Sequence, residues 1–298
     1  MDSPRTRAAA SPPQPEGPGG SGGDPARQAR GGTAVPGAAG AEPAGAAVAA
    51  AASDLLLAYG QRPALSGADF TLPAGRTVAL IGPNGSGKST LLRALARLVE
   101  PRSGRLDVPA WARRGAVALV LQTTEVDRSL PVTVREAVTM ARYAVRGAFG
   151  RLRAADHAAV AAALDRMGVT ELAGRQLHEL SGGQRQRALV AQGLAQEAEL
   201  LLLDEPVTGL DVVSRDLIFA AVAEERRAGR TVVVSTHDLD DARRADLVML
   251  LANRVVALGP PGDVLVESAL TAAYGGRVLR VGGGLLVMDD PHHAHAHG

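Results

Sequence analysis

The chain of 298 residues has no cysteine, one lysine and few aromatic residues, namely one tryptophan, three tyrosines and three phenylalanines. The lack of cysteine excludes a disulfide framework and a thiolate metal site. No run of about 20 apolar residues is present, which argues against a membrane span, and the N-terminus has no apolar signal core. The net charge of +1 gives no strong field that would attract nucleic acid. We therefore expect a cytosolic protein that reaches a membrane only through a partner.

The one lysine, Lys88, lies in the run Gly-Pro-Asn-Gly-Ser-Gly-Lys-Ser-Thr at residues 82–90. This run fits the pattern Gly-x-x-x-x-Gly-Lys-Ser/Thr of phosphate-binding loops. Residues 77–81 predict a buried strand before it, and leucines at helical spacing predict a helix after it. The loop would then present backbone N–H groups and a helix dipole to an anion. A lysine ammonium is a compact point charge that can reach the β- and γ-phosphates inside such a loop.

The alternative, a glycine-rich turn without a ligand, leaves the flanking strand and helix unexplained. The Ser89 hydroxyl is placed to ligate Mg²⁺. The residues expected to bind the nucleotide here are Gly82, Asn84, Gly85, Gly87, Lys88, Ser89 and Thr90.

The whole sequence divides into three parts. Residues 1–52 are rich in Pro, Gly and Ala and cannot bury enough apolar surface to offset the entropy of ordering, so we expect them to be disordered. Residues 53–275 alternate strands with helical segments, which indicates an α/β domain with a mostly parallel sheet. Residues 276–298 form a C-terminal extension with a histidine-rich tail. Strands are predicted at residues 55–59, 68–72, 77–81, 116–121, 200–203 and 231–235, with a hairpin at 247–258 and a helical stretch at 133–172.

Polar residues follow several predicted strands at their carboxyl ends, where parallel sheets bind ligands. Gln122, the pair Asp204-Glu205 and His237 each follow such a strand, as the phosphate loop does. In this setting Asp204 would hold Mg²⁺, and Glu205 would orient and deprotonate the attacking water. Alone, the two carboxylates could simply start a loop. Beside a phosphate loop, they predict a site of nucleotide hydrolysis.

A second anion site is predicted at residues 180–184, where Leu-Ser-Gly-Gly-Gln precedes an apolar helix. Ser181 is a suitable N-cap, and Gly182, Gly183 and Gln184 would begin the helix with exposed backbone N–H groups. One chain needs only one phosphate-binding loop for its triphosphate. We therefore expect the second anion site to contact a nucleotide that is held by another subunit. A simple capped helix start is the alternative.

Together these motifs resemble the nucleotide-binding subunit of an ABC transporter over residues 54–274. The matched motifs are Walker A at 82–90, the Q-loop residue Gln122, the signature at 180–184, Walker B ending at Asp204-Glu205, the D-loop at 209–211 and the switch histidine His237. The resemblance implies an α/β P-loop NTPase fold with a RecA-like core, an antiparallel β-subdomain and an α-helical ABC subdomain at about residues 123–180.

The resemblance also implies a mechanism. Two subunits would form a head-to-tail homodimer that closes on two ATP molecules with Mg²⁺, each held between Walker A of one chain and the signature of the other. Tyr59 would stack on adenine, His237 would contact the γ-phosphate, and Asp211 would border the nucleotide. Gln122 would approach the Mg²⁺ ion and link the site to the helical insert and a membrane permease. The subunit would then lie at the cytoplasmic face of the membrane, bound to that permease.

One position departs from the family pattern. The signature helix carries Gln192-Gly193, where the family usually has Arg-Ala. Because a glycine in mid-helix costs up to about 1 kcal/mol, the sequence predicts a locally weakened helix.

Two features of the sequence narrow the range of cargoes that the transporter would carry. Residues 127–143 and 256–261 are similar to the corresponding parts of zinc and manganese importer ATPases, and iron–siderophore and cobalamin importers share part of this pattern. In addition, the C-terminal tail is rich in histidine, and imidazoles suit Zn²⁺, Cu²⁺ and Ni²⁺. An incidental polar tail or a cloning remnant is the alternative. The candidate zinc ligands of the tail are His292, His293, His295 and His297.

The favoured interpretation is the ATPase subunit of a metal-ion importer, with zinc preferred, that meets an extracytoplasmic metal-binding protein only indirectly and binds no nucleic acid. An importer for manganese or an iron–siderophore is the first alternative. A soluble ABC ATPase acting on ribosomes or DNA is the second, but the chain has one Walker A, one signature and no room for a long coiled coil between residues 122 and 180. A metal-binding protein, suggested by the tail alone, would leave the hydrolytic site unexplained.

Overall fold

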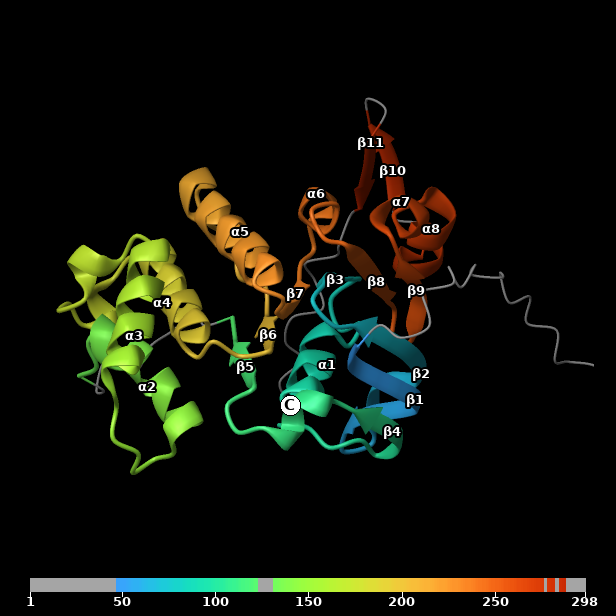
Figure 1. Ribbon diagram of the computed structural model, residues 1–298. Helices are drawn as coiled ribbons and strands as arrows, with labels where there is room; N and C mark the ends of the chain where they lie inside the picture. The colour runs from blue at the N-terminus through green and yellow to red at the C-terminus, as the bar shows by residue number, and fades with distance from the viewer. Residues whose placement is uncertain (1–46, 123–130, 276–277, 282–283, 288–298) are drawn as a thin grey trace, which may run out of the picture. The chain divides into compact units, whose positions relative to one another are not determined.

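The structure is a computed structural model that describes residues 47–122, 131–275, 278–281 and 284–287 (Figure 1). Its central feature is a six-stranded sheet with the order β5-β6-β7-β3-β8-β9. The first five strands run parallel, and β9 pairs with β8 in the antiparallel direction, which confirms the predicted α/β sheet and hairpin. The strands are β3 (Thr77–Ile81), β5 (Val117–Val120), β6 (Leu200–Leu203), β7 (Thr231–Ser235), β8 (Leu247–Leu251) and β9 (Val255–Gly259).

A three-stranded antiparallel sheet in the order β2-β1-β4 forms the expected β-subdomain. Its strands are β1 (Val48–Tyr59), β2 (Arg62–Pro73) and β4 (Ser103–Asp107). Residues 48–52, which were expected to be disordered, belong to β1 instead. The backbone explains the difference, because Ala51 pairs with Thr71 of β2 on one side and with Asp107 of β4 on the other. Main-chain hydrogen bonds thus order a segment that has little apolar side-chain surface.

The stretch expected to be helical at residues 133–172 contains two helices, α2 (Val134–Arg146) and α3 (Ala154–Arg166), and α4 (Gly182–Ala195) packs against both. The three helices lie together at the β5 end of the parallel sheet (Figure 1). Gly147 ends α2 with a φ of 91°, a conformation that glycine adopts at low cost.

Buried Arg142 ties the three helices together. Its Nε donates to Asp156 of α3 at 2.9 Å, and its Nη1 donates to the carbonyl of Ala195 at the end of α4 at 2.8 Å. The backbone N–H of Arg153, together with the guanidinium groups of Arg146 and Arg142, holds the pKa of Asp156 well below its usual range, although burial acts in the opposite direction. The charge of Asp156 is therefore fully compensated inside the helical subdomain.

The remaining described elements are helices and one further hairpin. No helix among the described residues is long and apolar enough to cross a lipid bilayer. These elements are α1 (Lys88–Leu95), α5 (Val212–Arg227), α6 (Leu239–Ala242), α7 (Pro261–Val264), α8 (Glu267–Tyr274), the 3-10 helices η1 (Pro109–Ala112), η2 (Thr170–Leu172) and η3 (Leu177–Glu179), and the hairpin β10 (Val278–Val281) and β11 (Gly284–Val287).

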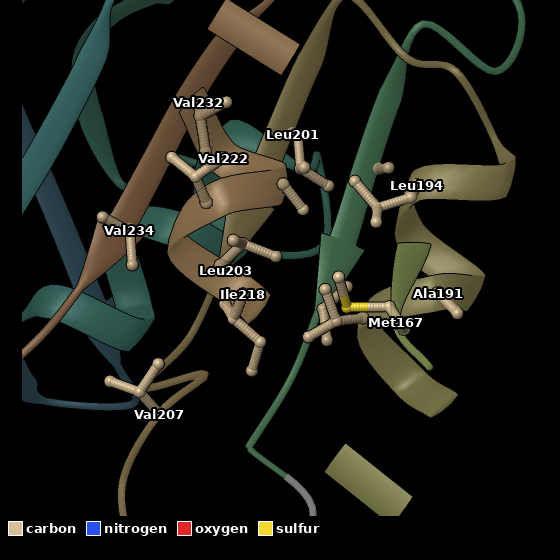
Figure 2. Close-up of a cluster of buried hydrophobic side chains, with 14 of the residues drawn as sticks. Met167, Ala191, Leu194, Leu201, Leu203, Val207, Ile218, Val222, Val232 and Val234 are labelled. Atoms are coloured by element: carbon tan, nitrogen blue, oxygen red, sulfur yellow. The ribbon is translucent and has the colours of Figure 1, made fainter. Parts of the chain in front are cut away.

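Alternate residues of the parallel sheet face two separate cores, because side chains in a strand point to opposite sides in turn. Ala79 and Ile81 of β3 pack into the core that includes the helices α2 to α5, part of which appears in Figure 2. Val78 and Leu80 pack into the core shared with α1 and the antiparallel sheet. Every residue of β3, β6 and β7 is buried, as expected for strands covered on both faces.

The glycine in the middle of α4 has a packing role. A Cβ atom at Gly193 would lie 2.5 Å from Cγ2 of Val120 in β5 and 3.3 Å from Cδ1 of Leu201 in β6. Both distances are shorter than ordinary van der Waals contacts, so α4 can lie this close to the sheet only without a side chain here. Close packing thus offsets the cost in helix propensity that the sequence predicts.

We expect Gly193→Ala to destabilise the domain. Alanine adds up to about 1 kcal/mol of helix propensity, but overpacking a core costs about 1–3 kcal/mol, so the net loss should reach up to about 2 kcal/mol in urea unfolding. The double variant Gly193→Ala/Val120→Ala makes room for the new methyl group and should lose less than the sum of the two single variants. An additive or stabilising result would contradict the packing role.

Candidate active site

The phosphate loop between β3 and α1 lies in close contact with neighbouring backbone. A Cβ atom at Gly82 would lie 2.1 Å from the carbonyl oxygen of Leu251 in β8, and one at Gly87 would lie 2.7 Å from that of Ala64 in β2. Gly85 has a φ of 75° and open space where a Cβ atom would be. Two glycines are therefore needed for packing beneath the loop, and the third lies on its open side.

Asn253, in the turn between β8 and β9, anchors this loop. Its side-chain Nδ2 donates to the carbonyls of Gly85 at 2.9 Å and Ala64 at 3.1 Å, and its backbone N–H donates to the carbonyl of Ser86 at 3.0 Å. The sequence predicts the hairpin but gives no sign that its turn holds a loop more than 160 residues earlier. The left-handed φ of 54° at Asn253 agrees with the tolerance of asparagine for this conformation.

Lys88 is the first residue of α1 and is buried. Its Nζ donates to the carbonyls of Gly82 at 2.6 Å and Pro83 at 3.1 Å, so the ammonium lies within the loop. A cleft of about 350 Å³ extends over this loop, and Asn84, Ser89 and Thr90 line it. Apart from Gly82, whose carbonyl accepts from Lys88, the residues that the sequence assigns to phosphate binding line this cleft.

Tyr59, the last residue of β1, and Arg62, the first residue of β2, line the same cleft. The Tyr59 side chain is half exposed, and its hydroxyl accepts a hydrogen bond from Arg93 of α1 at 3.3 Å. An aromatic face beside a phosphate loop is where a nucleotide base can stack.

One carboxylate and two hydroxyls meet at the end of β6. Oδ1 of buried Asp204 accepts hydrogen bonds from Oγ of Ser89 at 3.1 Å and Oγ of Ser235 at 2.7 Å. A carboxylate beside a hydroxyl is a hard oxygen donor set, which fits Mg²⁺. The Ser89 hydroxyl gives its proton to Asp204, so its lone pairs stay available to a cation.

Glu205 lies beside His237, which follows β7. Oε2 of Glu205 is 3.8 Å from Nδ1 of His237 and accepts a hydrogen bond from Thr208 at 3.1 Å. The His237 imidazole lowers the pKa of Glu205, and the Glu205 carboxylate raises the pKa of His237. Glu205 is therefore ionised at neutral pH, which is the state required of a general base. Its left-handed φ of 46° is unusual for a glutamate.

The signature residues lie outside this cleft. Ser181 caps α4 in a capping box with Gln184, and a Cβ atom at Gly183 would lie 3.6 Å from the Asp211 carboxylate. Asp211 itself caps α5 and accepts a hydrogen bond from the backbone N–H of Ser214 at 2.8 Å. Among the described residues that line the cleft there are none from 180–184 or 211, so the signature residues and the cleft are separate places on one chain.

Gln122 does not line the cleft, and other residues used in the sequence prediction lie outside the described part of the chain. Gln122 is exposed and lies just after β5, which β6 and β7 separate from β3 and its phosphate loop. Residues 123–130, which include part of the segment used to infer the cargo, lie outside the described residues, and so does the histidine-rich tail with His292, His293, His295 and His297.

Comparison with known proteins places this site in a family. The family profile described as ABC transporter matches residues 65–208. The zinc transport system ATP-binding protein TroB of Treponema pallidum is 38% identical over 255 residues, which cover 84% of this chain and 96% of that protein. The chain belongs to the ABC transporter ATP-binding family.

Other relatives of this ABC ATPase are named for the transport of other metals. The manganese transport system ATP-binding protein MntB of Bacillus subtilis is 36% identical and aligns with 76% of this chain and 92% of its own length. The chelated iron transport system membrane protein YfeB of Yersinia pestis is 38% identical and aligns with 73% of this chain and 75% of its own length.

Solved structures agree with the fold. An inward-facing ABC transporter of the metal-chelate type matches with a TM-score of 0.67 and 27% identity, covering 80% of this chain and 95% of that one. The dimeric ATP-binding cassette MJ0796 bound to ADP and Pi matches with a TM-score of 0.63 and 25% identity, covering 71% of this chain and 98% of that one. The predicted P-loop NTPase fold is thereby confirmed, and the ABC ATPase binds nucleotide and hydrolyses ATP.

We expect the substitution Glu205→Gln to lower the pKa of His237. The Glu205 carboxylate holds this pKa above its ordinary value of 6.5, so removing the negative charge should leave a smaller share of His237 protonated at neutral pH. An NMR titration of the imidazole Cε1 proton, assigned with His237→Gln, measures the shift. In the control Thr208→Val the carboxylate keeps its charge, and the pKa of His237 should stay raised. An unchanged pKa in Glu205→Gln would refute the pairing.

Proposed function

We propose that this ABC ATPase drives the import of a metal ion, with zinc as the favoured cargo. The observation that carries the proposal is its extended similarity to ATP-binding proteins named for the transport of zinc, manganese and chelated iron. Manganese and an iron chelate are therefore the alternative cargoes. A soluble ABC ATPase not coupled to transport is the alternative of another class, and none of the relatives described above is named for such a role.

In the proposed mechanism the cleft holds ATP with Mg²⁺. The phosphate loop and Lys88 bind the phosphates, and Tyr59 stacks on the base. Ser89 and Asp204 hold the Mg²⁺ ion, which supplies charge neutralisation to the phosphates when it is bound. Glu205, ionised beside His237, orients and deprotonates the attacking water. The hydrogen bonds to Asp204 and the pairing of Glu205 with His237 support these roles.

The separation of the signature residues from the nucleotide cleft supports a head-to-tail dimer with a second copy of the chain. The exposed start of α4 at Ser181 and Gly182 carries backbone N–H groups that can complete an anion site on the partner's nucleotide. Asp211, which caps α5 next to Gly183, then lies at the same junction. ATP closes this dimer because its γ-phosphate contacts both copies, and hydrolysis removes that contact.

The helical subdomain supports docking to a membrane permease. Met140 and Tyr143 of α2 are 51% and 39% exposed, and Phe149, just beyond the helix, is fully exposed. Met140 and Tyr143 are three residues apart and so lie on one face of α2, and neighbouring exposed apolar side chains mark an interaction site more often than single ones do. Gln122 at the end of β5 would link this region to the nucleotide, and the ATPase would lie at the cytoplasmic face of the membrane. An extracytoplasmic metal-binding protein would deliver the ion to the other side of the permease.

The catalytic assignment predicts a sharp separation of binding from hydrolysis. Glu205→Gln should keep nucleotide binding, because the phosphate loop is unchanged, but should lower the rate of ATP hydrolysis by about 10²–10⁴-fold. Phosphate release and nucleotide binding by fluorescence are measured on the same samples. The control is Glu199→Gln, the same substitution just before β6, which should hydrolyse ATP at the parent rate. Full ATPase activity in Glu205→Gln would refute the assignment of Glu205 as the general base.

The cargo is tested by uptake of radiolabelled zinc and manganese in the native host. We expect zinc uptake to be lost, and manganese uptake kept, both in a strain lacking the gene and in a strain carrying Glu205→Gln. Loss of manganese uptake instead would change the cargo and keep the mechanism. Unchanged uptake of both metals would remove the metal proposal.

The same uptake assay can test the proposed zinc-binding tail in a strain that carries a truncated chain. Deleting residues 291–298 removes four histidines while leaving the ATPase domain intact. If the tail senses zinc, uptake in the truncated strain should respond differently to the zinc supply, and the purified protein should bind less zinc. The matched control replaces the four histidines with glutamine, which keeps the length.

A further inference from the structure

A serine that no motif includes lies at the centre of the Walker B carboxylates. Ser235 is the last residue of β7 and is completely buried. Its Oγ donates to Oδ1 of Asp204 at 2.7 Å and accepts a hydrogen bond from the backbone N–H of Glu205 at 2.8 Å. One hydroxyl therefore connects the side chain of the first carboxylate with the backbone of the second.

The order of the strands creates this contact. β7 lies between β3 and β6, and Leu203 of β6 pairs with Val234 of β7. The next residues, Asp204 and Ser235, then stand side by side just beyond the last pair. Ser235 also pairs with Leu80 of β3, the strand that leads into the phosphate loop. The hydroxyl is thus fixed on a rigid strand with neighbours on both sides.

The two hydrogen bonds fit the chemistry of a hydroxyl group. A serine hydroxyl has one proton to donate and lone pairs to accept with, and here both are used. Through its proton it directs Oδ1 of Asp204, the same oxygen that accepts from Ser89. Through its lone pair it satisfies the backbone N–H of Glu205, whose left-handed φ of 46° needs support from its surroundings.

We propose that Ser235 is a positioning residue of the ATPase, which orients Asp204 towards the Mg²⁺ ion and fixes the backbone from which Glu205 reaches the attacking water. The inference rests on the roles proposed above for Asp204 and Glu205. Groups that orient the ligands of a metal commonly change metal affinity or activity by about 10–100-fold when they are removed. A hydroxyl that only filled space would change neither.

The test compares variants of the full chain in two measurements. Electron paramagnetic resonance follows the binding of Mn²⁺, which shares the oxygen ligands of Mg²⁺, in the presence of a non-hydrolysable ATP analogue. Steady-state kinetics give kcat and KM for ATP. We expect Ser235→Ala to raise the Mn²⁺ concentration at half-saturation and to lower kcat, each by about 10–100-fold, with KM for ATP unchanged.

Further variants separate positioning from packing. Ser235→Thr keeps a hydroxyl and should recover both quantities, whereas Ser235→Cys keeps the volume with a weak donor and should behave like Ser235→Ala. The matched control is Thr231→Val at the opposite end of β7, where a buried hydroxyl accepts from the backbone N–H of Gly75 at 2.9 Å and has no hydrogen bond to a carboxylate of the described residues. This control should leave Mn²⁺ binding and kcat at the parent values.

Two outcomes overturn the inference. If Asp204→Asn weakens Mn²⁺ binding but Ser235→Ala leaves both binding and kcat unchanged, Ser235 does not position the site and the magnesium role of Asp204 stands. If both variants bind Mn²⁺ as the parent does, the magnesium role of Asp204 falls as well. Unfolding midpoints of all variants show that the comparison is made on folded protein.

Discussion

The insertion of β7 between β3 and β6 is the constraint on which the active site depends. It separates the phosphate loop from the Walker B carboxylates by one strand, while the parallel direction brings all three strand ends to one edge. Ser89 can reach Asp204 across this gap because α1 begins immediately after the loop. His237 follows the intervening strand and therefore meets Glu205 without any long excursion of the chain.

The chemistry of the site could be predicted from the sequence where it depends on short spacing. The phosphate loop, the carboxylate pair and the capped start of α4 are each defined by a few consecutive residues next to a strand or helix. Ser235 and Asn253 could not be found in this way, because their roles depend on contacts between distant segments. Strand order decides which strand ends are neighbours, and periodicity carries no information about it.

The departures from the sequence prediction have the same origin. Alanines at the start of β1 have too little apolar surface to predict order, yet pairing with β2 and β4 orders them. The sequence predicts that Gly193 weakens α4, yet its lack of a side chain allows α4 to approach Val120 and Leu201. In both cases contacts between distant segments outweigh what the local sequence predicts.

The buried Arg142 has a mechanical consequence. It joins the carboxyl-terminal part of α2 to the carboxyl end of α4, while the amino end of α4 carries the signature residues. The exposed apolar side chains Met140 and Tyr143 lie on the same α2 helix. Because these hydrogen bonds hold α2 against α4, we expect a displacement of α2 to move the signature end of α4 with it.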